Sequence, residues 1–465
     1  MKTRMHPSII LEKLISSFVF ILLIAYYIIS QMIGELNTEN IQNTASTLLS
    51  FGLGIYMIGT IVIIILLLIF TVIFWISWKN TYLSFNNDSL IIERGKLFKK
   101  ITTIHLKDIA TINIKRNILE KVLGTSNLKI DLNTNEETYN GKLVFKQEKA
   151  KEIKNEILSR MGREIIKEEK QIESIIKYST KDVIRHMFLA TNLVSLLILI
   201  IVAVIIIGIT FLMDKPSSIA FAIIPTLIIL VPTVWEYIKS FLSYYNFKCT
   251  RENDNIKLSY GALTTYKFNL PIKKINTVII HQTLQAKILG YYLIEVVNAG
   301  IKAEEDEKTI ISLYVKEKEK NIIIDNILTE YKNDIITKHG NKNALKHYLI
   351  AKIFWIIISI IACPFTYYSS LLLIPIVLLI AYSQYKTRKI GNNDNMIVIS
   401  NGILNKKTTY TKYSNIEMIK SKQKLFSKIF NTRSLQINVV GPMANSTFIS
   451  GLFNTETIQK IVNKY

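Results

Sequence analysis

The stretch Leu270–Gly290 reads LPIKKINTVIIHQTLQAKILG, and the chain repeats its pattern twice. The counterparts are Ile104–Gly124, IHLKDIATINIKRNILEKVLG, and Thr411–Asn431, TKYSNIEMIKSKQKLFSKIFN, and the three stretches align without a gap. A pattern of apolar and turn residues that recurs three times predicts three copies of one structural unit. The repeat positions expected to be structural are Gly95, Gly261 and Gly402, then Ile109, Ile275 and Ile416, and finally Gly124, Gly290 and Asn431.

Each copy is predicted to be a small β-rich domain that ends in a helix. The first glycine follows a short apolar run and suits a hairpin turn with positive φ. Alternating apolar residues on either side of it predict half-buried strands. The second glycine, which is Asn431 in the third copy, closes a turn that tolerates the left-handed conformation. An amphipathic helix follows, with its apolar face carried by Ile153 and Ile157, Ile323 and Ile327, and Ile458 and Ile461.

Six apolar segments in three pairs lie before and between these domains. Crossing the hydrocarbon core takes about 20 apolar residues in a helix, and the first four segments are long enough. The last two are shorter and are interpreted as a tight helical hairpin. The segments are roughly Ile15–Ile33, Phe51–Trp75, Phe188–Leu212, Ile219–Leu242, Leu349–Phe365 and Tyr368–Tyr385.

The distribution of charge orients these segments. The tail before the first segment carries three basic residues, whereas the loop after it carries Glu35 and Glu39 and neither Lys nor Arg. Basic residues stay on the cytoplasmic side of a membrane. We therefore expect the N-terminus in the cytoplasm and, because each pair of segments returns the chain to the same side, all three β-rich domains there as well.

Composition supports a membrane protein with an anionic surface as its partner. The chain has 465 residues, a hydrophobic fraction of 49% and a formal net charge of +22, and its mean hydropathy is +0.28. A basic chain with long apolar segments is expected to meet the anionic cytoplasmic leaflet rather than nucleic acid, since it lacks interleaved aromatic and basic residues. Cys249 and Cys363 lie apart, so neither a disulfide framework nor a metal cluster is expected.

One family resemblance covers essentially the whole chain. Leu270-Pro271 with Ile275–Val278, Gln282, Leu284-Gln285, Lys287–Gly290 and Val297–Gly300 resembles the motif of the bacterial pleckstrin-homology-like domain family. The layout of paired spans alternating with three such domains is similar to that of YdbT-like membrane proteins. The middle copy matches best. The other copies depart from the motif at Lys107, Asp108, Asn113 and Glu120, and at Tyr413, Lys424 and Asn431.

The resemblance implies the expected fold. It is an α+β membrane protein with six transmembrane helices in three hairpins, alternating with three pleckstrin-homology-like β-barrels, each capped by a C-terminal helix. The expected boundaries are 1–78 for hairpin 1, 79–162 for domain 1, 163–186 for a charged linker, 187–243 for hairpin 2, 244–333 for domain 2, 334–385 for a linker and hairpin 3, and 386–465 for domain 3. For the linker, a surface-lying helix and a flexible segment both fit the sequence.

The resemblance also implies partners and a setting. It places the chain in the bacterial cytoplasmic membrane and suggests association with a smaller single-domain relative of the YdbS type. The family has no established enzymatic activity, and some relatives are associated with protection against membrane-active bacteriocins.

Candidate contact residues are basic pairs and a few motif positions. Lysine pairs early in the repeats are either a solvated face beside the membrane or contacts to anionic lipid headgroups, each worth about 1 kcal/mol near the surface. Three motif residues are candidates for a partner surface. The complete set is Lys99, Lys100, Lys273, Lys274, Lys406 and Lys407 with Pro271, Gln282 and Gln285.

The sequence predicts neither catalytic residues nor a cofactor or metal site. The six histidines lack paired ligand spacing, and no nucleophile elbow, phosphate loop or dinucleotide fingerprint occurs. Charged residues are missing from the centres of the apolar segments. The favoured function is a non-enzymatic membrane scaffold that binds a partner and protects the cell envelope. The alternatives are a transporter or exporter of a lipid or peptide, and an intramembrane enzyme, which is disfavoured.

Overall fold

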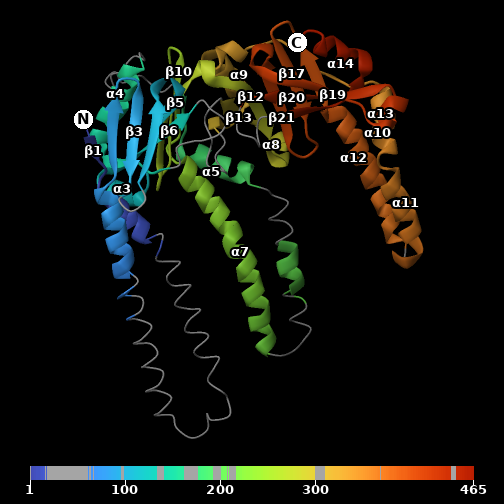
Figure 1. Ribbon diagram of the computed structural model, residues 1–465. Helices are drawn as coiled ribbons and strands as arrows, with labels where there is room; N and C mark the ends of the chain where they lie inside the picture. Colours follow the sequence, from blue (N-terminus) through green and yellow to red (C-terminus); the bar gives the residue numbers. More distant parts are fainter. Residues whose placement is uncertain are drawn as a thin grey trace. The chain divides into compact units, whose positions relative to one another are not determined.

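The computed structural model describes residues 2–15, 17, 61, 64–65, 67–95, 99–132, 141–161, 176–191, 200–206, 208, 216–298, 309–366, 368–440 and 447–465 (Figure 1). Two compact units divide the chain. The first comprises Met1–Ile130 and Tyr139–Glu168, and the second comprises Asp131–Thr138 and Glu169–Tyr465. The first unit contains repeat domain 1, and the second contains repeat domains 2 and 3.

Repeat domain 1 consists of two antiparallel layers and a covering helix. The first sheet has the order β1 (Lys2–Arg4), β2 (Tyr82–Asn86), β3 (Ser89–Arg94) and β4 (Lys100–His105). After the 3-10 turn η2 (Leu106–Asp108), the second layer contains β5 (Ile109–Arg116), α3 (Ile118–Val122), β6 (Thr125–Leu132) and β7 (Val144–Lys146). Helix α4 (Gln147–Arg160) buries Ile153 and Ile157 against the core.

Repeat domain 2 has the same order of elements. Strand β8 (Ile176–Lys177) and helix α5 (Thr180–Ala190) precede α7 (Pro216–Tyr244). The first sheet continues with β9 (Lys248–Glu252), β10 (Asn255–Tyr260) and β11 (Thr265–Pro271), followed by η3 (Ile272–Lys274). The second layer contains β12 (Ile275–Gln282), α8 (Leu284–Leu289), β13 (Tyr291–Asn298) and β14 (Thr309–Lys316). Helix α9 (Glu317–Asn326) and the 3-10 turn η4 (Thr329–Tyr331) complete the domain.

Repeat domain 3 follows the same plan around a helical hairpin. Strand β15 (Lys338–His339) and helix α10 (Lys342–Ile350) lead to α11 (Ile353–Ala362), η5 (Cys363–Thr366), η6 (Ser369–Leu372) and α12 (Leu373–Thr387). The first sheet adds β16 (Lys389–Asn392), β17 (Met396–Asn401) and β18 (Lys406–Lys412), followed by η7 (Tyr413–Asn415). Strands β19 (Ile416–Lys422), β20 (Thr432–Val439) and β21 (Thr447–Asn454) form the second sheet, with α13 (Leu425–Ile429) after β19 and α14 (Thr455–Val462) at the end.

In each domain the strand before the apolar hairpin pairs with the strand after it. Thr3 lies opposite Leu83, Ile176 lies opposite Cys249, and Lys338 lies opposite Ile390. The apolar segments therefore leave from, and return to, one edge of the same sheet in all three copies.

Repeat domains 2 and 3 share a continuous sheet. Strand β12 pairs with β18 from Thr277 opposite Thr411 to Gln282 opposite Lys406, so the order is β14-β13-β12-β18-β17-β16-β15. The cores also interlock, because Ile279 of domain 2 belongs to the hydrophobic cluster of domain 3 and Met396 of domain 3 belongs to that of domain 2. The two domains consequently form one packed body.

The repeated glycines lie in turns that require positive φ. Gly261 and Gly402 have φ values of 108° and 107°, and a Cβ at Gly402 would meet the carbonyl oxygen of Asn405. Gly290 and Asn431 end α8 and α13 with φ values of 69° and 50°. Glycine pays no steric penalty in this region, and asparagine pays less than most other residues.

The mixed α/β repeat architecture was predicted correctly. The predicted closed β-barrels are not found among the described strands. Among the described strands each domain forms open sheets, and none of these sheets closes on itself. A closed barrel would use the edge of β12, but that edge pairs with β18 of the next copy. Part of the 163–186 linker is also structured, since β8 joins the first sheet of domain 2 and α5 packs on β14.

Within the described residues, two helices are long and apolar enough to cross a membrane, Lys342–Phe365 and Ser369–Thr387. A shorter apolar helix covers Leu67–Lys79. These correspond to the predicted fifth and sixth segments and the end of the second, and α7 runs along the predicted fourth. Most of the predicted segment Ile15–Ile33 and much of Phe51–Trp75 and Phe188–Leu212 lie outside the described residues, so six spans remain a prediction.

Candidate functional site: the junctions of the apolar hairpins

The candidate site is a junction that occurs once in each repeat domain. A lead-in helix approaches the first apolar segment of each pair, and these helices are residues 8–15, α5 and α10. A lead-out helix returns from the second segment, and these are Leu67–Lys79, α7 and α12. The short helices α3, α8 and α13 occupy one repeat position and contact the lead-in helix of their own copy.

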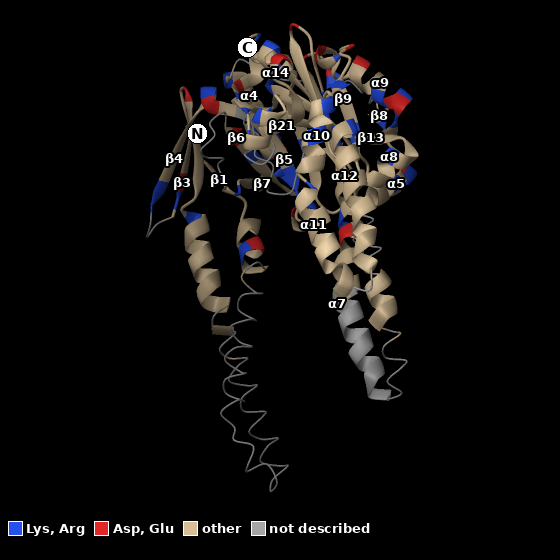
Figure 2. Ribbon diagram, turned by 90° about the vertical axis from the view of Figure 1, so that its right-hand side faces the viewer, with Lys and Arg blue, Asp and Glu red and all other residues tan. Residues whose placement is uncertain are grey.

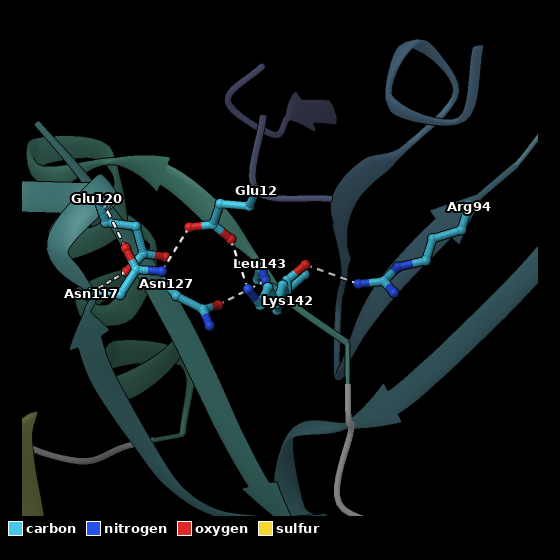
Figure 3. A network of polar contacts seen from close by, with 7 residues as sticks. All are labelled: Glu12, Arg94, Asn117, Glu120, Asn127, Lys142 and Leu143. Atoms are coloured by element: carbon cyan, nitrogen blue, oxygen red, sulfur yellow. Dashed lines mark hydrogen bonds and ion pairs between the residues drawn. The ribbon is translucent and has the colours of Figure 1, made fainter. Parts of the chain in front are cut away.

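In the first junction, one buried carboxylate fixes the lead-in helix to the domain (Figure 3). The amide of Asn117, which caps α3, donates to Glu12 Oε1 at 2.8 Å, and Lys142 Nζ lies 2.8 Å from Glu12 Oε2. The Glu12 side chain is only 4% exposed. Because a buried carboxylate is costly without donors, these two partners hold the helix at a defined position.

The same network continues on both sides of Glu12. Glu120 completes a capping box with Asn117, and its pKa is raised by burial and by the nearby Glu12 charge. On the other side, Arg94 Nη2 donates to the backbone oxygen of Lys142 at 3.0 Å. A Cβ at Gly141 would collide with the Arg94 guanidinium, so the glycine permits this close approach.

A cavity of about 240 Å³ opens beside this network, between the two helices of the junction. Burial and the neighbouring charges of Arg94 and Lys142 lower the pKa of Lys13. Trp78 lines the cavity and donates from its indole to the Met5 oxygen at 2.8 Å. A basic cavity at the end of an apolar helix suits a phosphate or carboxylate group at a membrane surface. Its lining is Met5, Ile9, Ile10, Lys13, Phe74, Ser77, Trp78, Thr81, Arg94, Gly141 and Lys142.

In the second junction, α8 holds the C-terminal end of α5. Thr283 Oγ1 donates to the Leu189 oxygen at 2.7 Å and also accepts from the Ala286 amide, which caps α8. Gln285 Nε2 donates to the Thr191 oxygen at 2.5 Å. Carbonyls at a helix end lack partners within the helix, so these side chains satisfy them where the chain departs toward its apolar segment.

The lead-out helix of the second junction is held by the turn between β10 and β11. The Gly261 amide donates to the Tyr245 oxygen and the Ala262 amide to the Leu242 oxygen, each at 2.8 Å. Both ends of the hairpin are therefore bonded to domain 2, through α8 on one side and through this turn on the other.

A buried histidine completes the second junction. His186 is 1% exposed, and its ring lies 4.7 Å from the Tyr244 ring and 5.4 Å from the Tyr314 ring. Burial lowers its pKa to about 3, although the charge of Glu295 acts in the opposite direction. Neither ring nitrogen has a hydrogen-bond partner in the described part of the chain. His186 is consequently a neutral spacer between the lead-in helix, the lead-out helix and β14.

The third junction uses aromatic contacts and one tyrosine hydroxyl. Tyr348 of α10 accepts from the Leu452 amide at 2.9 Å, and the Arg388 guanidinium, just after α12, lies 5.3 Å from the Tyr348 ring centre. The ring of His347 lies 6.5 Å from Phe426 of α13. The position of the junction is thus shared by the copies, whereas its chemistry is not.

Lysines surround α8. Burial and the charges of Lys389, Lys287 and Lys320 lower the pKa of Lys406. Lys316 Nζ donates to the Leu289 oxygen at 2.8 Å. Figure 2 shows Lys and Arg distributed over the sheet domains, whereas α11 and α12 are almost free of them. Such a concentration of basic groups favours an anionic neighbour.

The structure separates the sequence-predicted site residues into three groups. Gln282 and Gln285 serve internal contacts, since Gln282 donates to the Tyr291 oxygen at 3.0 Å and Gln285 binds α5. Lys406 and Lys407 lie opposite Gln282 and His281 in the β12–β18 ladder. The others stay apart: Lys99 and Lys100 before and in β4, Pro271 at the end of β11, and Lys273 and Lys274 in η3.

Several junction residues escaped sequence reasoning. Asn117 and Thr283 occupy the same repeat position, which the alignment of the copies could have identified as a shared helix cap. Glu12, Arg94 and Lys142 carry no such signal because they belong to different elements. In the residues that the structure covers, no group of three His, Cys, Asp or Glu side chains suits a metal ion.

Comparisons with known proteins agree with this repeat architecture. The model of the bacterial PH domain family matches residues 17–161, 188–326 and 346–464. Over 192 residues the chain is 23% identical to the UPF0699 transmembrane protein YdbT of Bacillus subtilis (strain 168), a match that covers 40% of this chain and 39% of that protein. The matched region thus spans less than half of the relative's length. No solved structure matches the chain.

Proposed function

This chain belongs to the bacterial PH domain family, and we propose that it is a non-enzymatic membrane scaffold whose PH domains lie on the cytoplasmic side and bind a partner membrane protein. The observation that carries the proposal is the pairing of strands across each apolar hairpin. Residues before and after a hairpin that share one sheet must lie on the same side of a membrane. Each hairpin therefore makes an even number of crossings, as three two-helix anchors require.

The shared sheet of domains 2 and 3 supports a scaffold role. In addition to the β12–β18 ladder, Asn276 Nδ2 donates to the Val440 oxygen at 2.6 Å and Asn415 Nδ2 to the Asn276 oxygen at 3.2 Å. A rigid joint limits relative motion of domains 2 and 3, which suits a platform better than a transport path that must open and close.

Strand β19 supplies a site for the partner. Strand β12 has β13 and β18 as neighbours, whereas β19, at the same repeat position, has only β20 among the described strands. An open edge accepts another strand through main-chain hydrogen bonds. A PH domain of a smaller relative of the YdbS type would place there the strand that corresponds to β18. Lys420 and Lys422 favour acidic residues in such a strand.

A photo-crosslinking amino acid at Met418 of β19, which is 37% exposed, tests this partner site in cells. The same amino acid at Asp325 of α9 is the matched control. We expect reproducible adducts with another PH-domain membrane protein from position 418 only. Equal or absent adducts at the two positions would remove β19 as the partner site.

The physiological role that we propose is protection of the envelope against membrane-active peptides such as bacteriocins. Thr409 of β18 lies opposite both Ile279 and Ile399, so Thr409→Pro removes a ladder hydrogen bond while Thr409→Val retains it. Cells without the gene, complemented with each version, would be challenged with pore-forming peptides and with detergents. Selective protection by the wild type and the valine variant supports the role, and unchanged sensitivity in the deletion strain would sink it.

A further inference from the structure

One repeat position carries an exposed apolar side chain in all three copies. Val122, Ile288 and Ile429 are 78%, 75% and 68% exposed. Each belongs to the short helix of its junction, follows a lysine and precedes another apolar residue. The lysines are Lys121, Lys287 and Lys428, and the following residues are Leu123, Leu289 and Phe430.

We call this exposed side chain, Val122, Ile288 or Ile429, the tip of its short helix. The tip points the same way in each copy. Two positions before it, Glu120, Ala286 and Ser427 are 2%, 0% and 1% exposed. One side of the short helix is therefore anchored while the tip points outward. Single exposed apolar residues are ordinary, but a recurrence at one position in three copies indicates a surface with a use.

The turn that follows the tip is open. Gly124 and Gly290 have φ values of 66° and 69°, and a Cβ on either would meet no atom within 4 Å. These glycines are needed for the positive φ of the turn and not for close packing. In the described part of the chain, no atom lies against the turn at these positions.

The tip of α8 lies beside the apolar hairpin. Helix α8 is bonded through Thr283 to Leu189, and the turn at Ala262 is bonded to Leu242. Leu189 is where the chain begins its third apolar segment, and Leu242 is where the fourth ends. Figure 1 shows α8 at the edge of the sheets from which α7 extends.

The other tips are held in the same way. Asn117, at the start of α3, binds Glu12 on the lead-in helix at 2.8 Å. The rings of Phe426 and Phe430, on either side of Ile429, lie 6.5 and 6.1 Å from the ring of His347 on α10. In every copy the tip is thus attached to the helix that leads into the apolar segment.

Basic side chains surround the α8 tip. Lys316 reaches the Leu289 oxygen at 2.8 Å, and Lys287 Nζ lies 3.4 Å from the Ile403 oxygen. Apolar side chains framed by lysines match the boundary of an anionic bilayer, where acyl chains lie beneath negative headgroups.

We propose that the pairs Val122–Leu123, Ile288–Leu289 and Ile429–Phe430 insert into the interfacial region of the membrane that the apolar hairpins cross. The neighbouring lysines contact anionic headgroups there. This inference rests on the proposed function, because the tips meet a bilayer only if the adjoining hairpins are anchored in it. Each insertion would add a contact between its own PH domain and the leaflet.

Fluorescence of the full-length chain in liposomes of phosphatidylethanolamine and phosphatidylglycerol tests the proposal. An environment-sensitive probe is attached to Ile288→Cys in a Cys363→Ala background, with Cys249 left in place because it is buried. Lys318→Cys, on the exposed surface of α9, is the matched control. Val122→Cys and Ile429→Cys provide independent readings if one variant misfolds.

We expect quenching by nitroxide-labelled lipids to be at least about threefold greater at the tip positions than at position 318, together with a blue-shifted emission. If aqueous iodide quenches the probe at the tip positions as strongly as the probe at position 318, the inference is overturned. Tips that are shielded from iodide but unquenched by lipid would also overturn it, and would indicate cover by a second copy.

Alkaline carbonate extraction of the same liposomes separates this inference from the proposed function. Protein that stays in the bilayer while its tips remain exposed to water overturns only the insertion of the tips. Protein that is released by carbonate overturns both, because the hairpins would then not be membrane anchors.

Discussion

At the residue scale, the buried imidazole of His186 makes the second junction sensitive to pH. Its pKa is about 3 in the folded chain, whereas an unperturbed histidine titrates near 6.5. The unfolded state therefore binds more protons below pH 6.5, and folded stability is lost as pH falls through that value. At pH 5 the loss is about 2 kcal/mol.

The measurement is the unfolding midpoint of the detergent-solubilised protein between pH 7.5 and pH 5. His186→Phe keeps the ring against Tyr244 and Tyr314 but cannot be protonated, so its midpoint should vary less with pH. It should also be more stable at pH 7 by roughly 1 kcal/mol, because two buried nitrogens that have no partner among the described residues are removed. His105→Gln, on the exposed side of β4, is the control, and identical pH slopes for wild type and His186→Phe would contradict the assignment.

A second residue-scale prediction concerns Thr283. Its hydroxyl joins α8 to α5, and the side chain is 7% exposed. Thr283→Val preserves the shape but leaves the Leu189 oxygen without its shortest donor and the Ala286 amide without its cap. We expect a loss of about 1–3 kcal/mol in the free energy of unfolding.

Thr283→Ser retains the hydroxyl and should recover most of that loss. Hydrogen exchange locates the effect, since amides at the end of α5 should exchange faster in the valine variant than in the serine variant. If both variants unfold at the wild-type denaturant concentration, the hydroxyl does not hold α5 in place.

At the element scale, the β12–β18 ladder can be tested by a disulfide. Thr277 and Thr411 lie opposite each other, and their hydroxyl oxygens are 3.1 Å apart. Facing side chains at this separation suit the short Cβ distance of a disulfide. Thr277→Cys with Thr411→Cys should therefore form a bond on mild oxidation in membranes, detected as a linked peptide by mass spectrometry.

The matched control pairs Thr277→Cys with Thr409→Cys, which lies two residues away on the same face of β18. Comparable linkage in both pairs would mean that the register is not fixed. Linkage in the control alone would mean that β18 is shifted by two residues relative to β12.

The sequence predicted those elements whose signals are local and repeated. Gly261 and Gly402 marked hairpin turns, and the alternating residues of β10 and the short apolar run of β17 marked strands, because these patterns follow from backbone sterics and burial. Strands β8 and β15 were missed because two residues each carry no periodic signal. The ladder between β12 and β18 was missed because pairing between domains depends on the whole surface of each.

The candidate contact residues stay predictions, and the structure adds internal roles for some of them. Gln285 looked like a surface residue of the motif, but it caps α5 with a bond of 2.5 Å to Thr191. A glutamine in a repeated motif fits an internal bridge and a partner contact equally well, and only the position of α5 decides between them. The role of Glu12 could not be predicted for a similar reason, because its partners Asn117 and Lys142 are far from it in sequence.

At the scale of the whole molecule, the third hairpin is the anchor whose crossing is least obvious from length. Its helical stretches, Lys342–Phe365 and Ser369–Thr387, contain 24 and 19 residues. At 1.5 Å per residue the second extends roughly 28 Å, close to the hydrocarbon thickness of about 30 Å. The first includes α10, which packs on domain 3, so its apolar part after Lys352 is shorter than the full stretch. Ser370 Oγ donates to the backbone oxygen of Ser359 at 2.8 Å. This hydrogen bond joins the two helical stretches and gives both polar groups a partner.

Cys363 lies at the tip of this hairpin and reports whether it crosses. If the PH domains are cytoplasmic and the hairpin spans the bilayer, a membrane-impermeant maleimide should label Cys363 in intact cells. Cys249 is fully buried, and burial raises the pKa of its thiol, so it should remain unlabelled and Cys363→Ala should remove the signal. Labelling that requires permeabilised cells would mean that the tip stays on the cytoplasmic side. The third PH domain would then be held by a re-entrant hairpin, whereas the strand pairing of β15 with β16 would still stand.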